Sequence, residues 1–415
     1  MKQLLLISFD LIREGEPGIS LAAGYLIAYM RSDGLYGRGF QVTHFPFNLH
    51  NNRINGKDTV IKSITSRHKL SHFDSIAISC YVWSDYLINP LIKSLRENGF
   101  RGKIILGGYQ ISYVNNLEID YPDCQVFILG QGEKSLLKAI YLPNQSPNYP
   151  VKLDIQPEVS LLPSPYLSNV IPVEKGQLKV RIETKRGCPY SCSFCAHRDL
   201  QHSGFYNHAD ETIFQELMFF KKKSVKKINV IDPLFNIGDQ YLRILERCSD
   251  IGIDSRISLQ TRFEPIRGQE GDRFLELCSG LNVTLEFGLQ TIHKRELKVL
   301  NRENDLTNTK RVLKELSKRG IVYEVTLLYG IPNQTIRSFG ESIRFLRDRG
   351  CTNVKAFPLM LLKGTDLCRK KHSWLCEESL EGDLRLPVVV CSTSFSRADW
   401  DKMKDMADSL IEIKT

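Results

Sequence analysis

Three cysteines stand within eight residues of the chain, Cys188, Cys192 and Cys195 in the stretch "RGCPYSCSFCAHR". Cysteine thiolates are strong ligands for soft metals, so this spacing predicts a metal site. The other cysteines are scattered singly along a chain of 415 residues. That scatter is typical of small buried side chains rather than of a disulfide framework.

Structural zinc is the simplest reading of the cluster, with His197 as a fourth ligand. Structural zinc sites usually take two ligand pairs separated by a loop, because a tetrahedron must be approached from two sides. One tight Cys-x3-Cys-x2-Cys loop does not offer this, and His197 lies only two residues past Cys195. An all-thiolate site favours an iron–sulfur cluster with three irons held by cysteine and one iron left open for chemistry.

The elements that must position this loop follow from the order of apolar and polar runs. Residues 1–143 alternate apolar strands, such as "QLLLISF" and "KIILGG", with helices, which predicts a parallel sheet covered on both faces. Residues 144–175 are rich in proline, serine and asparagine and are predicted to be a linker. Residues 176–365 repeat the alternation with six strands, enough for a partial (β/α)6 barrel, and residues 366–415 form a short, less regular extension.

The cluster segment "CPYSCSFC" resembles the Cys-x3-Cys-x-aromatic-Cys motif of radical S-adenosylmethionine (SAM) enzymes, with Phe194 as the aromatic residue. The resemblance extends over roughly residues 176–370. It implies a [4Fe-4S] cluster on the three cysteines, which are then also the catalytic residues, and SAM on the open iron. In this family one electron cleaves SAM to methionine and a 5′-deoxyadenosyl radical, which abstracts a hydrogen atom from the substrate.

Other barrel segments carry the same resemblance. "INVIDPLFNI" places Asp232 where relatives receive the SAM amino group, and "LEFGLQT" with "LKVLNRENDLTNT" places Gln290 and Arg302 near its carboxylate. An arginine fork suits a carboxylate bidentately. "LLYGIPNQT" resembles the fifth-strand pattern and adds Tyr329 to the expected SAM contacts. Thr326, where many relatives have aspartate, and Lys363, where proline is usual, depart from the family pattern, and the first puts the ribose contacts in doubt.

Several of these residues have plainer interpretations. Arg302 could instead cap the end of a helix, and Gln290 could satisfy backbone groups at the end of a strand. Gln260, Arg262 and Glu264 follow the third barrel strand, and strand alternation would put all three on one face, which is the barrel interior if the strand continues that far. We expect Gln260 and Arg262 to contact the cofactor there; a surface or structural role is the alternative.

The first domain resembles the Rossmann-like, cobalamin-binding domain that precedes the barrel in one radical SAM subgroup. The resemblance rests on "PGISLAAGYLIAYMRSDG", "FDSIAISCYVWSD", "KIILGGYQIS" and "VFILGQGEKSLL". Ligands of such sheets bind at the carboxyl ends of the strands. The residues expected to contact cobalamin are Ser79, Tyr81, Gly107, Gly108, Tyr109, Gly132 and Glu133.

Cobalamin domains that ligate cobalt through histidine carry Asp-x-His-x-x-Gly after the first strand. This chain has Asp10 and Gly15 at those positions but Ile12 in place of the histidine. Isoleucine has no lone pair, so we expect cobalamin without a histidine lower ligand. The alternative is that the domain persists as a scaffold without cobalamin.

The pairing of the two domains predicts a cobalamin-dependent radical SAM methyltransferase that methylates an unactivated carbon. The alternative is a radical SAM dehydratase, epimerase or oxidoreductase without cobalamin turnover; Cys391 is then a candidate hydrogen-atom donor, or simply a buried strand cysteine. A non-catalytic sensor is a third class, which the intact cysteine motif disfavours.

The expected partners are a small-molecule or peptide substrate and a reductant such as flavodoxin or ferredoxin. The formal charge is +9, but the one dense basic cluster, at residues 221–227, ends a predicted helix and reads as solvated, so we expect no nucleic acid. No apolar run is long enough to span a bilayer, and the apolar N-terminus reads as a strand, so the expected location is the cytoplasm.

Overall fold

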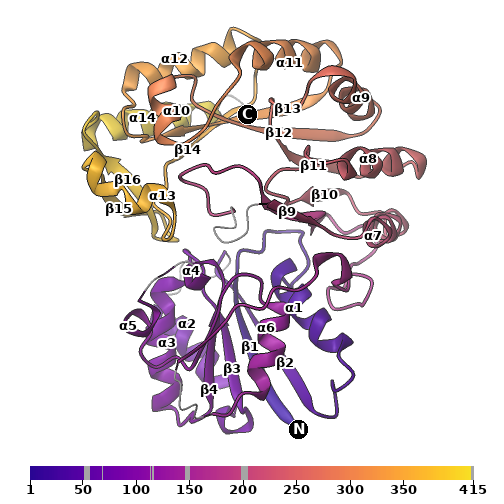
Figure 1. Cartoon of the computed structure of the whole chain (residues 1–415), viewed down its shortest axis with the longest axis vertical. Helices are drawn as coiled ribbons and strands as arrows, with labels where there is room; N and C mark the ends of the chain where they lie inside the picture. The colour runs from indigo at the N-terminus through magenta and orange to yellow at the C-terminus, as the bar shows by residue number, and fades with distance from the viewer. Residues whose placement is uncertain are drawn as a thin grey trace. The chain divides into compact units, whose positions relative to one another are not determined.

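The computed structural model of the chain describes residues 1–50, 57–67, 69–112, 114, 116–144, 150–197 and 204–412. The chain divides into two compact units. The first comprises Met1–Val173 with Gly382–Arg385, and the second comprises Glu174–Glu381 with Leu386–Thr415. Figure 1 follows the chain from the indigo strands of the first unit to the yellow C-terminal helix of the second.

The first unit is built on a six-stranded parallel sheet of order β2-β1-β3-β4-β5-β6. Its strands are β1 (Lys2–Asp10), β2 (Phe40–Asn48), β3 (Ser75–Ser79), β4 (Lys103–Gly107), β5 (Val126–Ile128) and β6 (Val151–Leu153). The inner strands are almost continuously apolar because helices cover both faces of the sheet. Alternate residues of β1 accordingly enter two separate apolar clusters, one on each face.

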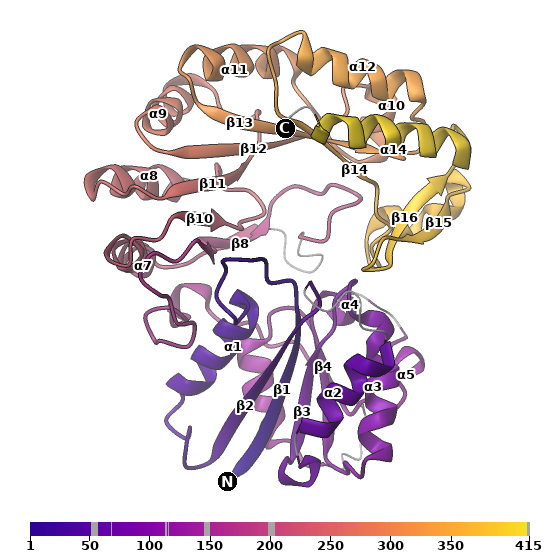
Figure 2. The ribbon, with the colours of Figure 1, turned by 180° about the vertical axis from the view of Figure 1, so that it is seen from behind.

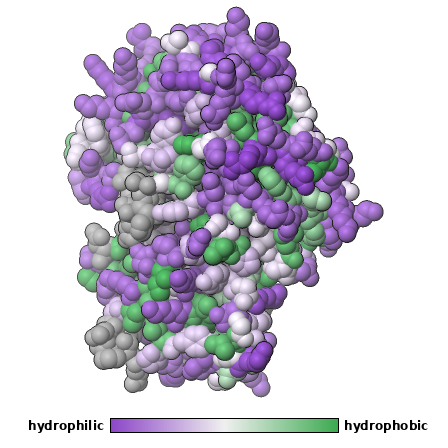
Figure 3. All heavy atoms as spheres, turned by 45° about the vertical axis from the view of Figure 1, so that its right-hand side comes forward, coloured by the Kyte–Doolittle hydropathy of each residue, from purple (hydrophilic) through white to green (hydrophobic). Residues whose placement is uncertain are grey.

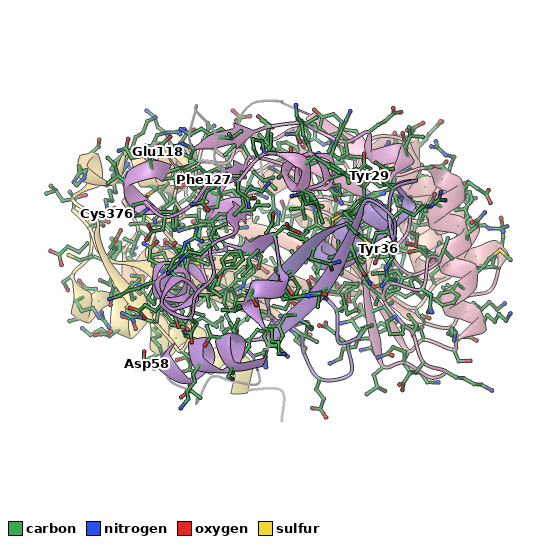
Figure 4. The ribbon with its side chains drawn as sticks, turned by 90° about the horizontal axis from the view of Figure 1, so that it is seen from below. Tyr29, Tyr36, Asp58, Glu118, Phe127 and Cys376 are labelled. Carbon is green, nitrogen blue, oxygen red and sulfur yellow. The ribbon has the colours of Figure 1, made fainter. Side chains whose placement is uncertain are left out.

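Within the described residues of this unit, α1 and α6 pack on one face of the sheet and α2 and α3 on the other (Figure 1). Phe127 of β5 lies in the cluster beneath α2 and α3, and Tyr36 packs against the opposite cluster (both labelled in Figure 4). The helices are α1 (Leu21–Ser32), α2 (Lys57–Arg67), α3 (Asp85–Glu97), α4 (Tyr109–Ser112), α5 (Leu117–Asp120) and α6 (Glu133–Tyr141), with 3-10 turns at Leu70–His72 and Val159–Leu161.

The predicted linker over residues 144–175 is wrong for the part that the structure describes. Val151–Leu153 forms β6, which pairs in parallel with β5 and extends the sheet. Beyond it Tyr166, Val170 and Ile171 are buried in the first unit. Residues 145–149 of the predicted linker lie outside the described residues.

The second unit contains a six-stranded parallel sheet of order β14-β13-β12-β11-β10-β7, as the predicted partial barrel requires. The sheet is curved, and helices lie along its convex side in both views, namely α8, α9, α11 and α12 (Figures 1 and 2). The strands are β7 (Lys179–Ile182), β10 (Lys227–Val230), β11 (Arg256–Thr261), β12 (Val283–Gln290), β13 (Val322–Tyr329) and β14 (Val354–Pro358). The helices are α7 (Asp210–Lys222), α8 (Gln240–Asp250), α9 (Gly268–Ser279), α10 (Lys294–Val299), α11 (Leu306–Lys318) and α12 (Ile336–Arg347).

Side chains alternate sharply across this sheet. One face is apolar, with buried residues such as Ile228, Leu259 and Leu285, and it packs under the helices. The other, which we call the inner face, carries polar side chains from all six strands. In the view of Figure 3, hydrophilic residues also cover most of the outer surface of this unit.

Two expectations for the second unit need correction. The run "LKVRIETKRG" is not one strand, because the chain leaves the main sheet after β7 and continues as β8 (Lys185–Cys188), paired with β9 (Gly204–Asn207). The C-terminal extension is more regular than expected and belongs to the second unit apart from the tip Gly382–Arg385. It comprises α13 (Asp366–Arg369), a 3-10 turn (Lys371–Trp374), the hairpin β15 (Glu377–Glu381) with β16 (Leu386–Cys391), and α14 (Arg397–Glu412).

Candidate functional site

The three clustered cysteines lie at the end of β8 and in the loop that follows it. Cys192 is buried, and Cys188 and Cys195 are half-buried. Burial, together with the neighbouring Cys192 and Cys188, raises the pKa of the Cys195 thiol to about 11, so the three thiols interact electrostatically. No three His, Cys, Asp or Glu side chains of the described ranges converge on one metal ion. The cysteines of an iron–sulfur cluster bind different irons, so the donor set fits such a cluster.

The cysteine loop is held by hydrogen bonds to the end of α10. The Ser193 hydroxyl donates to the carbonyl of Val299 (2.7 Å), and the Ser193 N–H donates to the carbonyl of Leu300 (2.9 Å). The Asn301 amide donates to the carbonyl of Ser191 (2.7 Å). We call these contacts the loop latch, and they fix the loop without any metal.

A buried carboxylate holds the other side of the loop, where β7 gives way to β8. Asp232 accepts hydrogen bonds from the backbone N–H groups of Thr184 (2.6 Å) and Lys185 (3.2 Å) and from the Thr184 hydroxyl. Burial raises the pKa of Asp232 to about 6. Both carboxylate oxygens therefore already have partners in the protein, and contact between Asp232 and the SAM amino group stays a prediction.

Arg262 is fixed beside the cysteine loop by three different contacts. Its guanidinium lies 3.8 Å from the ring centroid of Tyr190, and its Nε donates to Glu264 (2.9 Å). A second nitrogen donates to the carbonyl of Glu303 (3.2 Å). The Glu264 Oε1 atom is buried and accepts no hydrogen bond from any described residue. An unpaired buried carboxylate oxygen beside an ordered arginine is a candidate acceptor for a ligand amino group.

Arg302 also lies close to the three thiols. Its Nε donates to the Asn304 side chain (2.9 Å), and another nitrogen donates to the carbonyl of Gly288. The pKa of Arg302 is lowered by burial and by the nearby Arg262 guanidinium, while the Cys192 thiol raises it. Two guanidinium groups that repel one another beside the thiols favour an anionic ligand, as the carboxylate of SAM would be.

Gln290 ends β12 in a strained conformation. Its φ of 69° is in the left-handed region, and the strand pairing shifts register between Gly288 and Gln290. A Cβ at Gly288 would lie 2.6 Å from the Gln290 amide nitrogen. The amide oxygen of Gln290 is buried with no hydrogen-bond partner among the described residues. Local strain with an unpaired polar atom is typical of a binding site, which agrees with the predicted place of Gln290.

The remaining predicted SAM contacts differ in where they lie. Gln260 is on the inner face and donates to Glu286, and Phe194 is half-buried in the cysteine loop. Tyr329 packs between Phe339 of α12 and Trp400 of α14, in the apolar layer beneath the helices. The structure therefore gives Tyr329 a packing role and does not bring it to the thiols.

The predicted cobalamin contacts of the first unit lie at the carboxyl ends of its strands. In the strand register Ser79 lies beside Gly107, and both precede the loops that carry the other predicted residues. Gly108 has a φ of +112°, and a Cβ there would lie 2.5 Å from the carbonyl oxygen of Cys80, so only glycine fits. The full set at this edge is Ser79, Tyr81, Gly107, Gly108, Tyr109, Gly132 and Glu133.

Two features at this edge were missed by the sequence analysis. The rings of Tyr81 and Trp83 stack with centroids 4.7 Å apart, which gives a flat aromatic surface. The Asn48 side chain accepts from the N–H of Ile12 (3.1 Å) and donates to its carbonyl (2.8 Å). The backbone at the position of the missing histidine is therefore fixed by β2 rather than left as an open loop.

A buried polar chain connects β1 and β2 close to this edge. The Ser8 hydroxyl donates to Asp10 (2.7 Å) and lies 2.9 Å from His44 Nε2. Burial lowers the pKa of His44 to about 4, so the ring is neutral near pH 7. The sequence does not single out His44, because its hydrogen-bond partner Ser8 lies 36 positions away.

The three-thiol loop follows β8 in a unit built on a six-stranded parallel sheet with helices between its strands. Residues 182–346 match the family model of the Radical SAM superfamily. Over these residues the chain is similar to radical SAM domains, in agreement with the resemblance of the cysteine motif.

Curated relatives match both units at low identity. TokK of Streptomyces tokunonensis, a cobalamin-dependent radical SAM methyltransferase, is 24% identical over 308 residues, which are 67% of this chain and 45% of TokK. The 2-(S-pantetheinyl)-carbapenam-3-carboxylate methyltransferase of Streptantibioticus cattleyicolor is 22% identical over 365 residues, 80% of this chain and 52% of that protein. The chain thus spans about half the length of these two relatives.

Solved structures confirm the predicted fold class for the whole chain. The methyltransferase TsrM of Kitasatospora setae, solved with cobalamin and a [4Fe-4S] cluster, matches with a TM-score of 0.67 and 17% identity over 88% of this chain and 77% of TsrM. OxsB, solved with aqua-cobalamin and SAM, matches with a TM-score of 0.69 and 15% identity over 98% of this chain and 66% of OxsB. None of the helices in the described ranges combines the length and apolar character needed to cross a membrane.

The loop latch predicts the effect of Ser193→Ala. The substitution removes the hydrogen bond to the carbonyl of Val299. We expect it to lower the free energy that holds the loop against α10 by roughly 1–2 kcal/mol. We expect a chelator to remove iron from the anaerobically reconstituted variant about tenfold faster than from the wild type, as followed by absorbance. Ser279→Ala, which removes a similar hydroxyl-to-carbonyl bond on the exposed end of α9, is the control. Equal rates in Ser193→Ala and the wild type would contradict the latch.

The buried neutral His44 predicts a pH dependence for the first unit. The native ring takes up a proton near pH 4 and the unfolded ring near pH 6.5, so unfolding binds a proton between these values and stability falls as pH decreases. The loss is up to about 3 kcal/mol. Hydrogen exchange of β1 and β2, corrected for intrinsic rates, should show this slope in the wild type and a shallower one in His44→Gln. The exposed His72→Gln variant should keep the wild-type slope; an unchanged slope in His44→Gln would refute the assignment.

Proposed function

We propose that this chain is a cobalamin-dependent radical SAM methyltransferase acting on an unactivated carbon of a small molecule or peptide. The observation that carries the proposal is the association, in one chain, of a radical SAM domain with a six-stranded parallel-sheet unit whose carboxyl edge is lined with glycine. TokK, the carbapenam-carboxylate enzyme and TsrM, which match both parts, are methyltransferases.

In this proposal Cys188, Cys192 and Cys195 hold three irons of a [4Fe-4S] cluster. Arg262 and Arg302, which flank the thiols, bind and orient the carboxylate of SAM. The unpaired buried oxygens of Glu264 and Gln290 accept hydrogen bonds from the polar groups of SAM. When bound, the cluster supplies the electron that cleaves SAM, and cobalamin supplies the methyl group.

The first unit supplies the cobalamin site in this proposal. Gly107 and Gly108 let the backbone approach a large ligand closely, since a side chain at Gly108 would meet the Cys80 carbonyl. Ile12, held by Asn48, cannot coordinate cobalt from the position where histidine ligands stand in other cobalamin domains. The stacked Tyr81 and Trp83 offer an apolar surface at the same edge.

One observation favours a second candidate, a radical SAM enzyme without cobalamin turnover. Cys391, at the end of β16, is half-buried rather than enclosed in a core, and it lies close enough to Cys376 (labelled in Figure 4) to raise the pKa of that thiol. A partly accessible thiol suits a hydrogen-atom donor. This candidate predicts 5′-deoxyadenosine as the product of SAM without S-adenosylhomocysteine.

The two candidate functions predict different results for the retention of cobalamin and for the products formed from SAM. The chain should be purified anaerobically with hydroxocobalamin and then supplied with SAM, a reductant and candidate substrates. We expect about one cobalamin per chain by absorbance, and both S-adenosylhomocysteine and 5′-deoxyadenosine during turnover. The triple variant Cys188→Ala, Cys192→Ala, Cys195→Ala should lose iron and 5′-deoxyadenosine but retain cobalamin, because the cofactors bind to different units. Turnover with 5′-deoxyadenosine alone, or a wild type that retains no cobalamin, would refute the methyltransferase proposal.

A further inference from the structure

Three cationic side chains stand in one row across the inner face of the second unit. Lys227, the first residue of β10, pairs in register with Lys179 of β7 on one side and with Arg256 of β11 on the other. Register partners in a parallel sheet point to the same face, so the three charges lie side by side. Like charges directly opposite one another destabilise a sheet, so packing alone does not explain this row.

The next row along the same face begins with Arg181 of β7 and continues with neutral hydrogen-bonding groups. Asn229, Ser258 and Thr284 are register partners on β10, β11 and β12. Ser258 is 3% exposed, and its hydroxyl completes no hydrogen bond within the described part of the chain, although it lies near enough to Glu286 to lower the pKa of that carboxyl. A buried hydroxyl left open beside a row of cations is an unexplained donor aimed at the same space.

The carboxylates of the inner face form their printed contacts with residues other than Lys227 and Arg256. Glu324 is in an ion pair with Lys355 (2.7 Å), and Glu286 accepts from Gln260. Both carboxylates raise the pKa of Lys227. Burial and the neighbouring cations Arg256 and Lys179 lower it, and the net pKa is below the usual range. Neither Lys227 nor Arg256 has a hydrogen bond or an ion pair with any residue that the structure describes.

We propose that Lys227 and Arg256, with Ser258, form a binding site for an oxyanion, a phosphate or a carboxylate, at the amino ends of the barrel strands. Such a ligand would relieve the repulsion within the row and satisfy the open hydroxyl. The guanidinium of Arg256 can bind two oxygens, and Lys227 supplies a compact charge beside it. Nothing in the cysteine motif or the SAM contacts involves these residues.

The position of the site specifies a class of substrate, and this step rests on the proposed function. Arg256 begins β11, and Arg262, which stands beside the thiols, follows six residues later. At about 3.3 Å per residue the backbone positions of Arg256 and Arg262 are at most about 20 Å apart. The oxyanion is therefore the anionic end of an extended substrate whose reacting carbon lies near the cluster.

The test measures oxyanion binding by the full chain without cluster or cobalamin. Inorganic phosphate and succinate are titrated separately at constant ionic strength, with binding followed by calorimetry. We expect wild-type binding with a Kd in the millimolar range, weakened about tenfold in Lys227→Gln/Arg256→Gln and severalfold in Ser258→Ala. The control Lys222→Gln/Lys226→Gln removes the same charge from exposed positions nearby and should bind like the wild type.

The outcomes are decisive in either direction. Binding of phosphate alone, or of succinate alone, identifies the end group of the substrate, and binding of both supports a general oxyanion site. Absence of binding to the wild type, or equal affinity in the wild type and Lys227→Gln/Arg256→Gln, overturns the proposal. Because no cofactor is needed, its failure leaves the methyltransferase proposal standing, and failure of SAM cleavage leaves the oxyanion site standing.

Discussion

The cysteine loop depends on the buried carboxylate of Asp232, which takes three hydrogen bonds from Thr184 and Lys185 at the point where the chain leaves the main sheet. A carboxylate 1% exposed is costly unless every lone pair is used, so these contacts fix the turn between β7 and β8. Lys185 then donates to the carbonyls of Phe235 (2.8 Å) and Ile237 (2.9 Å). The junction is thereby tied to the segment that follows Asp232 itself.

The far side of the loop depends on α10, which is anchored by a second buried carboxylate. Glu296 accepts from the hydroxyls of Thr291 (2.5 Å) and Ser338 (2.5 Å), which joins the end of β12 to α12. The last turn of α10 then presents its carbonyls to Ser193. Both ends of the cysteine loop are thus held by hydrogen bonds to segments that buried acids anchor.

The sequence predicted the two parallel sheets well, because apolar runs are local properties, and the ligand role of the three cysteines stays a prediction. It failed where distant residues decide local structure. The run from Lys179 to Gly187 looks like one strand, and only Asp232, about fifty positions away, breaks it. Val151–Leu153 was missed as a strand because it is short, lies in a proline-rich stretch and gains its stability from pairing with β5.

The left-handed turn at Gln290 and the packing of Tyr329 likewise depend on neighbours in space. The cationic row had a sequence signal, since Lys179, Lys227 and Arg256 each begin a strand, but its meaning required the register between strands.

The central claim is that the vacancy left by three cysteines is the position where SAM binds. Electron–nuclear double resonance of the reduced, reconstituted chain with SAM labelled with ¹⁵N at its amino group and ¹⁷O at its carboxylate tests this claim directly. The account predicts hyperfine coupling of both labels to the cluster, with a change in its electron paramagnetic resonance spectrum on addition of SAM. A spectrum unchanged by SAM, with no coupling to either label, would contradict it.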